Sequence, residues 1–224
     1  MDAVFISFFH MKIAQIRKEI TKIRTTKFGI SVPELKKFAK RIAKEDYKEF
    51  LDNNRFETFE LRLLHAFVLG YAKDDIETLL GYFERFMPYV DDWAVNDSLC
   101  QSFKIARKYP QTVWDFLMRY KKSDKEFESR IVSVMLLSHY LNDKYINKVI
   151  KVLDCLNADD YYSQMGIAWA IATVMGKYPE LCLTYLQSND CHLNATTYSK
   201  TIRKIIESFR VGDDMKNTVR TLRK

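Results

Sequence analysis

Two side chains one helical turn apart have the types and spacing to stabilise a positive charge. Trp93 and Asp97 are four residues apart, so a helix would place them on one face. An ionised carboxylate stabilises a cation that develops beside it, and an indole face attracts a cation. Trp169 is a candidate for the same site, because a 34-residue repeat relates its helix to theirs. The plainer alternative is that both tryptophans lie in the core and that Asp97 is a surface charge.

These residues must be positioned by helices, which the apolar pattern predicts nearly throughout the chain. Apolar residues recur at intervals of three and four, as at Leu61, Leu64 and Val68. Helices of about 10–18 residues are expected between helix-breaking segments. These segments are 53–54, 73–75, 87–88, 109–110, 122–124, 142–143, 157–159, 178–179 and 188–190.

A repeat of 34 residues relates the second helix of each predicted helical hairpin. One column of small or apolar residues comprises Ala66, Cys100, Val134, Ala168 and Ile202. A second column of large apolar residues comprises Leu69, Phe103, Leu137, Ile171 and Ile205. Two such columns predict stacked helical hairpins that share one core. The tetratricopeptide consensus is absent, so we expect short HEAT-like repeats in an all-α, right-handed α-α superhelix with a concave face.

A column of polar residues and a repeated proline motif add two further expectations to this repeat. The polar or amphipathic column is expected to face the concave groove, and it comprises Arg62, Asn96, Arg130, Gln164 and Tyr198. The tripeptide Lys-Tyr-Pro occurs at 108–110 and again at 177–179, and its proline is expected to open the next helix. We expect one repeat domain over residues 12–224. Residues 1–11 are expected to be an N-terminal extension, and Met11 is an alternative start to Met1.

Several classes of protein are excluded by what the chain lacks. None of the 6 glycines forms a G-x-G pair, which excludes phosphate-binding loops of the Walker and Rossmann kinds. No apolar run approaches the length of a membrane span, and no secretory signal is evident. The 4 cysteines form no CxxC pair, so we expect reduced thiols in a cytoplasmic protein. The 4 histidines show no ligand spacing, so no metal site is expected.

The positive charge is concentrated near the two ends of the sequence. The net charge is +7, but residues 10–44 alone hold +9 and residues 194–224 hold +5. Residues 45–193 hold −6. This distribution is typical of a protein that grips a polyanion at two places. The alternative is that the lysine-rich helices are merely solvated.

Short motifs in a fixed order resemble a known family. They are FGISVPEL at 28–35, ELR at 60–62, DWAVNDS at 92–98, ESRIV at 128–132, QMGIAW at 164–169 and TIRKIIES at 201–208. Over residues 12–212 the chain resembles the bacterial HEAT-like DNA alkylation repair glycosylases of the AlkD type. In this resemblance, 92–98 matches the family's Trp-x-x-x-Asp motif, 128–132 its arginine-bearing helix and 164–169 the helix with its second tryptophan.

The chain departs from the family pattern in two places. The best-known members carry a lysine and a doubled tryptophan where this chain has Asp91-Asp92-Trp93. They also carry a tyrosine-containing segment that is shortened here to residues 24–27. The added acids and the lost aromatic side chain are expected to weaken DNA binding or to change the preferred lesion.

The resemblance implies an N-glycosylase that excises cationic N3- or N7-alkylated purines from double-stranded DNA. Asp97 would stabilise the cationic sugar, and Trp93 and Trp169 would hold the lesion and its sugar. The DNA phosphates would be bound by Arg130, Lys104, Lys108, Lys200, Arg203 and Lys204. No cofactor is needed, and a monomer is expected. The alternative is a HEAT-like scaffold that binds nucleic acid or protein without catalysis.

Overall fold

The computed structural model describes residues 16, 18, 30–156 and 158–222, and the expected extension at 1–11 lies outside them. Helices account for 73% of the structure, and the described residues contain no strand, which confirms the all-α prediction. None of the described helices is both long and apolar enough to cross a bilayer. The chain divides into two compact units, Met1–Lys108 and Tyr109–Lys224. The single repeat domain expected over residues 12–224 stays a prediction.

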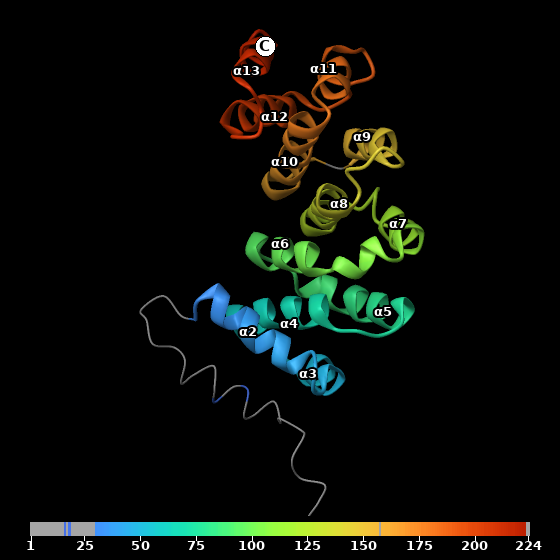
Figure 1. The fold of residues 1–224 in the computed structure, drawn as a ribbon, viewed down its shortest axis with the longest axis vertical. Coiled ribbons are helices and arrows are strands. Elements are labelled where there is room, and N and C mark those ends of the chain that lie inside the picture. Colours follow the sequence, from blue (N-terminus) through green and yellow to red (C-terminus); the bar gives the residue numbers. More distant parts are fainter. Residues whose placement is uncertain (1–15, 17, 19–29, 157, 223–224) are drawn as a thin grey trace, which may run out of the picture. The chain divides into compact units, whose positions relative to one another are not determined.

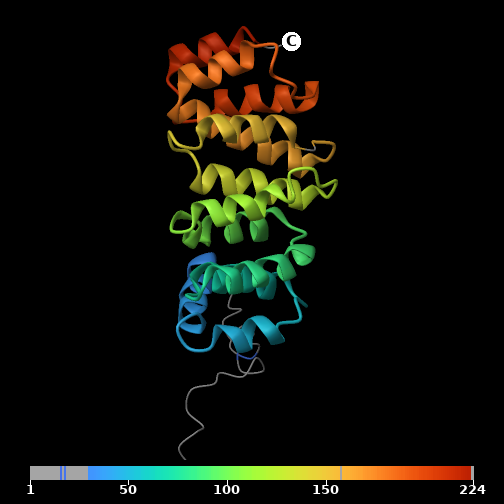
Figure 2. The same ribbon diagram turned by 90° about the vertical axis from the view of Figure 1, so that its right-hand side faces the viewer.

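The first unit contains helical hairpins whose second helices pack on one another. In Figures 1 and 2, α2, α4 and α6 are neighbours, with α3 and α5 beside them. The elements are α2 (Val32–Ile42), α3 (Tyr47–Asn53), α4 (Phe59–Tyr71), α5 (Ile76–Phe86), the 3-10 helix η1 (Met87–Tyr89), α6 (Trp93–Ser102) and the 3-10 helix η2 (Lys104–Arg107).

The second unit repeats this arrangement, with α10 packed between α8 and α12 (Figure 1). Its elements are α7 (Pro110–Met118), α8 (Glu126–His139), α9 (Ile146–Cys155), α10 (Tyr161–Lys177), α11 (Pro179–Gln187), α12 (Ala195–Glu207) and α13 (Asp213–Arg220). Pro110 and Pro179 open α7 and α11, which confirms the prediction for the Lys-Tyr-Pro motif.

The predicted apolar columns form the core of each unit. Ala66, Cys100, Val134 and Ala168 are fully buried, and Ile202 is 1% exposed. The second column is also buried, except that Leu137 is half-buried. All four cysteines are free thiols. The 34-residue period therefore predicted the inward face of each second helix correctly.

Glycine allows the second helices to approach each other closely. A Cβ at position 70 would lie 1.9 Å from the Oγ of Ser102, and one at position 166 would lie 2.5 Å from the Oγ of Ser133. Each contact joins residues about one repeat apart, so α4 and α6, like α8 and α10, pack on each other at similar positions of the repeat.

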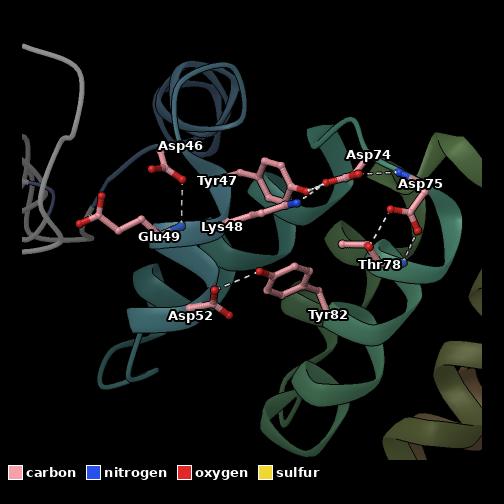
Figure 3. Close-up of polar contacts among 9 residues, drawn as sticks. All are labelled: Asp46, Tyr47, Lys48, Glu49, Asp52, Asp74, Asp75, Thr78 and Tyr82. Atoms are coloured by element: carbon pink, nitrogen blue, oxygen red, sulfur yellow. Dashed lines mark hydrogen bonds and ion pairs between the residues drawn. The ribbon is translucent and has the colours of Figure 1, made fainter.

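Polar contacts fasten the first helices of the first unit to one another (Figure 3). The hydroxyl of Tyr47 on α3 donates to Asp74 in the loop before α5, and the Nζ of Lys48 lies 2.7 Å from the same carboxylate. The hydroxyl of Tyr82 on α5 donates to Asp52 at 3.1 Å. These contacts join α3 to α5 and to the loop before α5.

Candidate functional site

Helix α6 presents Trp93 and Asp97 one turn apart in the first unit. The carboxylate of Asp92 caps the helix by accepting a hydrogen bond from the backbone N–H of Ala94 at 2.7 Å. Trp93, the first residue of the helix, is 51% exposed. Asp97 is 9% exposed. The plainer alternative is therefore wrong on both counts in this unit: Trp93 is not in the core, and Asp97 is shielded from solvent.

The two acids that distinguish this chain from the pattern of the family that it resembles have structural partners. Asp92 is the helix cap, and Asp91 forms an ion pair with Arg62, whose Nε lies 3.2 Å from the Asp91 Oδ1. The Arg62 Nη1 also donates to the carbonyl of Phe56 at 3.1 Å. Part of the added negative charge is thus compensated beside the site by Arg62.

Helix α8 places Arg130 in a buried position in the second unit. Arg130 is 6% exposed, and its Nη1 donates to the backbone carbonyl of Tyr162 at 3.0 Å. Its guanidinium carbon lies 5.9 Å from the centre of the Tyr162 ring. A Cβ at Gly166 would be 3.2 Å from the Arg130 Cγ, so the close approach of α10 encloses the arginine stem. Arg130 therefore contributes to the α8–α10 contact as well as being a predicted phosphate ligand.

Helix α10 carries Trp169, which is half-buried and so is not sealed in the core. The third tryptophan, Trp114, is 8% exposed and packs its ring 5.3 Å from that of Tyr140. The partial exposure of Trp93 and Trp169, in contrast to Trp114, agrees with their selection as site residues.

The predicted phosphate ligands differ in their exposure to solvent and in their ion pairs. Lys104 and Lys108 follow α6 and are exposed. On α12, Arg203 is exposed, and both it and Lys204 pair with Glu207 at 3.4 and 3.5 Å. Such exposed ion pairs are weak, so a DNA phosphate can replace the carboxylate.

Lys200 is held more firmly than the other lysines of the site. Its Nζ donates to the Oε1 of Gln164 and lies 4.5 Å from the centre of the Tyr161 ring. Burial, together with the neighbouring Arg203, lowers the pKa of Lys200.

The polar column does not form an open surface, which corrects the sequence-based expectation. Asn96 is fully buried, and Arg130 and Gln164 are 6% and 8% exposed. The Nε2 of Gln164 donates to the carbonyl of Ala158, six residues earlier, as Arg62 does to Phe56. Buried polar groups need such partners, so Arg62 and Gln164 tie the loops before α4 and α10 to those helices.

The candidate site is distributed over both units. Trp93, Asp97, Lys104 and Lys108 belong to the first unit, and Arg130, Trp169 and the α12 cations belong to the second. The convergence of the two sets on one surface stays a prediction. Tyr161, which is 56% exposed beside Lys200, lies outside the predicted set of site residues, although it occurs two repeats after Trp93. No group of three or more potential metal ligands occurs among the residues that the structure describes.

Comparison with known proteins gives one match. The family model described as DNA alkylation repair enzyme matches residues 2–205. No curated protein and no solved structure matches the chain.

Proposed function

Because the chain belongs to the family of DNA alkylation repair enzymes and so has a role in that repair, we propose that it is a DNA N-glycosylase. Its substrates are cationic N3- and N7-alkylated purines in double-stranded DNA. The observation that carries the proposal is the pairing, on α6, of an exposed indole and a shielded carboxylate one turn away. This pairing lies in residues 92–98, which resemble the family's Trp-x-x-x-Asp motif.

The chemistry requires stabilisation of a cationic sugar more than activation of the leaving group. Alkylation at N3 or N7 gives the purine a positive charge, so the base leaves as a neutral molecule. Positive charge then develops at C1′ of the deoxyribose. The low exposure of Asp97 strengthens its interaction with that charge, because less water screens it. The same carboxylate can orient the water that attacks C1′.

The two tryptophans hold the lesion, and the cations hold the DNA backbone. The exposed face of Trp93 offers cation–π contact to the alkylated base and CH–π contact to its sugar. Trp169 is the second indole that the resemblance to the family implies. Arg130 binds the phosphate next to the lesion, because a guanidinium presents several N–H donors in a fixed fork that matches phosphate oxygens. Lys104, Lys108 and the α12 cations bind flanking phosphates.

Release of alkylated base is the experiment that tests the proposal. Duplex DNA containing 7-methylguanine or 3-methyladenine is incubated with the wild type and with Asp97→Asn, and free base is quantified by chromatography. The variant keeps the side-chain size but loses the charge, so excision should fall by roughly 10²–10³-fold. Binding to DNA should be retained or tightened, because a negative charge near phosphate has been removed.

Asp91→Asn is the matched control, because it removes a carboxylate near the same helix end without touching the predicted catalytic group. It should excise at nearly the wild-type rate. Equal excision by the wild type and Asp97→Asn contradicts the mechanism. Binding of DNA by the wild type without any excision identifies a binding scaffold instead.

A further inference from the structure

An aromatic residue stands at the same repeat position near the start of four successive second helices. The residues are Phe59, Trp93, Phe127 and Tyr161, each 34 positions after the last, and we call them the aromatic column. Phe59, Trp93 and Tyr161 are the first residues of α4, α6 and α10, and Phe127 is the second residue of α8. Trp93 of the candidate site is therefore one member of a repeated feature.

Three of the four residues of the aromatic column are exposed, whereas the apolar columns are buried. Phe59 is 41% exposed, Trp93 51% and Tyr161 56%, and Phe127 is half-buried. Side chains in the first turn of a helix lean toward its N-terminus and so extend past the contact with the neighbouring helix. A single exposed aromatic residue needs no explanation, but the same exposure repeated at one period indicates a function.

Within the first unit, Phe59 lies beside Trp93 on the adjacent helix. At the C-terminal end of α6, the hydroxyl of Ser102 donates to the carbonyl of Ala66 on α4 at 3.4 Å. Just before the start of α6, Asp91 pairs with Arg62 in the first turn of α4, so the two helices run in the same direction. Helices packed in this way have axes about 8–10 Å apart. The first residues of α4 and α6 are thus neighbours on one edge of the unit.

Within the second unit, Tyr161 has a cation beside its ring. The Nζ of Lys200 lies 4.5 Å from the ring centre, and Lys200 forms no ion pair with a carboxylate of the described residues. Arg203 is close enough to lower the pKa of Lys200. An aromatic ring with a lysine ammonium beside it matches a deoxyribose with its phosphate.

We propose that the aromatic column contacts the backbone of bound duplex DNA, with each of its three exposed rings packed on the apolar face of a deoxyribose. Phe59 then extends the contact made by Trp93, and Tyr161 makes the equivalent contact in the second unit beside Lys200. A spacing of about 8–10 Å corresponds to roughly three base-pair steps along the axis of duplex DNA, at 3.4 Å each. The proposal rests on the proposed function, because it requires DNA as the ligand.

Fluorescence anisotropy with an undamaged duplex and with a duplex carrying a stable abasic-site analogue tests the column. Phe59→Ala and Tyr161→Ala should each weaken binding to both duplexes about five- to tenfold. The dependence of affinity on salt should keep its slope, because loss of a ring contact releases no counterion. Lys200→Met should instead reduce that slope by about one unit.

Two exposed aromatic residues outside the column serve as controls. Phe209→Ala, where the side chain is fully exposed, and Tyr89→Ala, where it is 48% exposed, should bind within twofold of the wild type. Phe59→Trp and Tyr161→Phe should restore affinity, and unchanged melting temperatures should show that the column variants fold.

The outcomes separate this proposal from the glycosylase. If the wild type excises alkylated base and the column variants bind like the controls, the proposal for the aromatic column is wrong and the proposed glycosylase activity is supported. If the wild type binds DNA but excises no base, while the column variants lose affinity for DNA, the proposal for the aromatic column is supported and the proposed glycosylase activity is wrong. Equal losses in the column and control variants contradict the column proposal.

Discussion

Arg130 combines a predicted phosphate contact with a buried structural position. One N–H donates to the carbonyl of Tyr162, and the side chain is enclosed between α8 and α10. Arg130→Ala should therefore have two effects that can be measured separately. The salt slope of DNA binding should fall by about one unit. The free energy of unfolding should fall by about 1–3 kcal/mol, because the Tyr162 carbonyl loses a donor.

Arg130→Lys distinguishes these effects, because it keeps the charge but has a different donor geometry. It should restore most of the salt slope and only part of the stability, as measured by anisotropy and by denaturant unfolding. A wild-type slope in Arg130→Ala contradicts the phosphate contact and leaves Arg130 a structural residue.

His65 gives the first unit a stability that depends on pH. It is 2% exposed, and its Nδ1 lies 3.3 Å from the Nδ2 of Asn54, which can donate to it. Burial, with a smaller effect from Arg85, lowers the pKa of His65 to about 3. In the unfolded chain this pKa is about 6.5, so between these values the unfolded state binds the extra proton. The folded state therefore loses stability as pH falls below about 6.5.

The expected loss from His65 is about 1.4 kcal/mol per pH unit over most of this window, measured by urea unfolding at pH 7 and pH 4.5. His65→Gln should remove this dependence, although it lowers stability at pH 7. His192→Gln is the control, since His192 is exposed and the neighbouring Asp154 raises its pKa. An identical pH dependence in the wild type and His65→Gln would exclude His65 as its source.

At the scale of the element, the α8–α10 contact depends on Gly166. An alanine Cβ there would lie 2.5 Å from the Ser133 Oγ and 3.2 Å from the Arg130 Cγ, so the helices would have to separate. Gly166→Ala should destabilise the protein by about 1–3 kcal/mol, the usual cost of overpacking. Thermal unfolding measures this change.

Gly81 provides a matched control on another helix. It lies within α5 and is exposed, and a Cβ there would meet no atom within 4 Å. Gly81→Ala should stabilise the protein by about 0.5–1 kcal/mol, because alanine is favoured in helices. Destabilisation by both substitutions would mean that close packing at position 166 is not the cause.

At the scale of the whole molecule, the charge distribution predicts the salt dependence of DNA binding. Six predicted phosphate ligands, each displacing about 0.9 counterion, give a slope of about −5 for log affinity against log salt. Affinity measured from low to moderate salt checks this value. A slope near zero would contradict DNA binding through these cations, despite the net charge of +7.

The sequence alone was sufficient to predict the helices and their inward faces. Burial repeats with the helical period and with the 34-residue repeat, so Ala66, Cys100 and Val134 could be assigned to the core without coordinates. The pairing of Trp93 with Asp97 followed for the same reason, because four residues make about one helical turn. The helical period and the repeat period depend only on the order of residues, so both can be found in the sequence.

Only the tertiary structure decided which polar residues are exposed. Asn96, Arg130 and Gln164 have the side chains of a surface column, yet all three are buried. Their burial depends on partners from other parts of the chain, such as the Tyr162 carbonyl, which lies 32 residues after Arg130. A polar side chain is stable in the interior when it finds such a partner, and in solvent when it does not. Residue type does not distinguish these two cases, so the role of Asp91 as the partner of Arg62 emerged only from the fold.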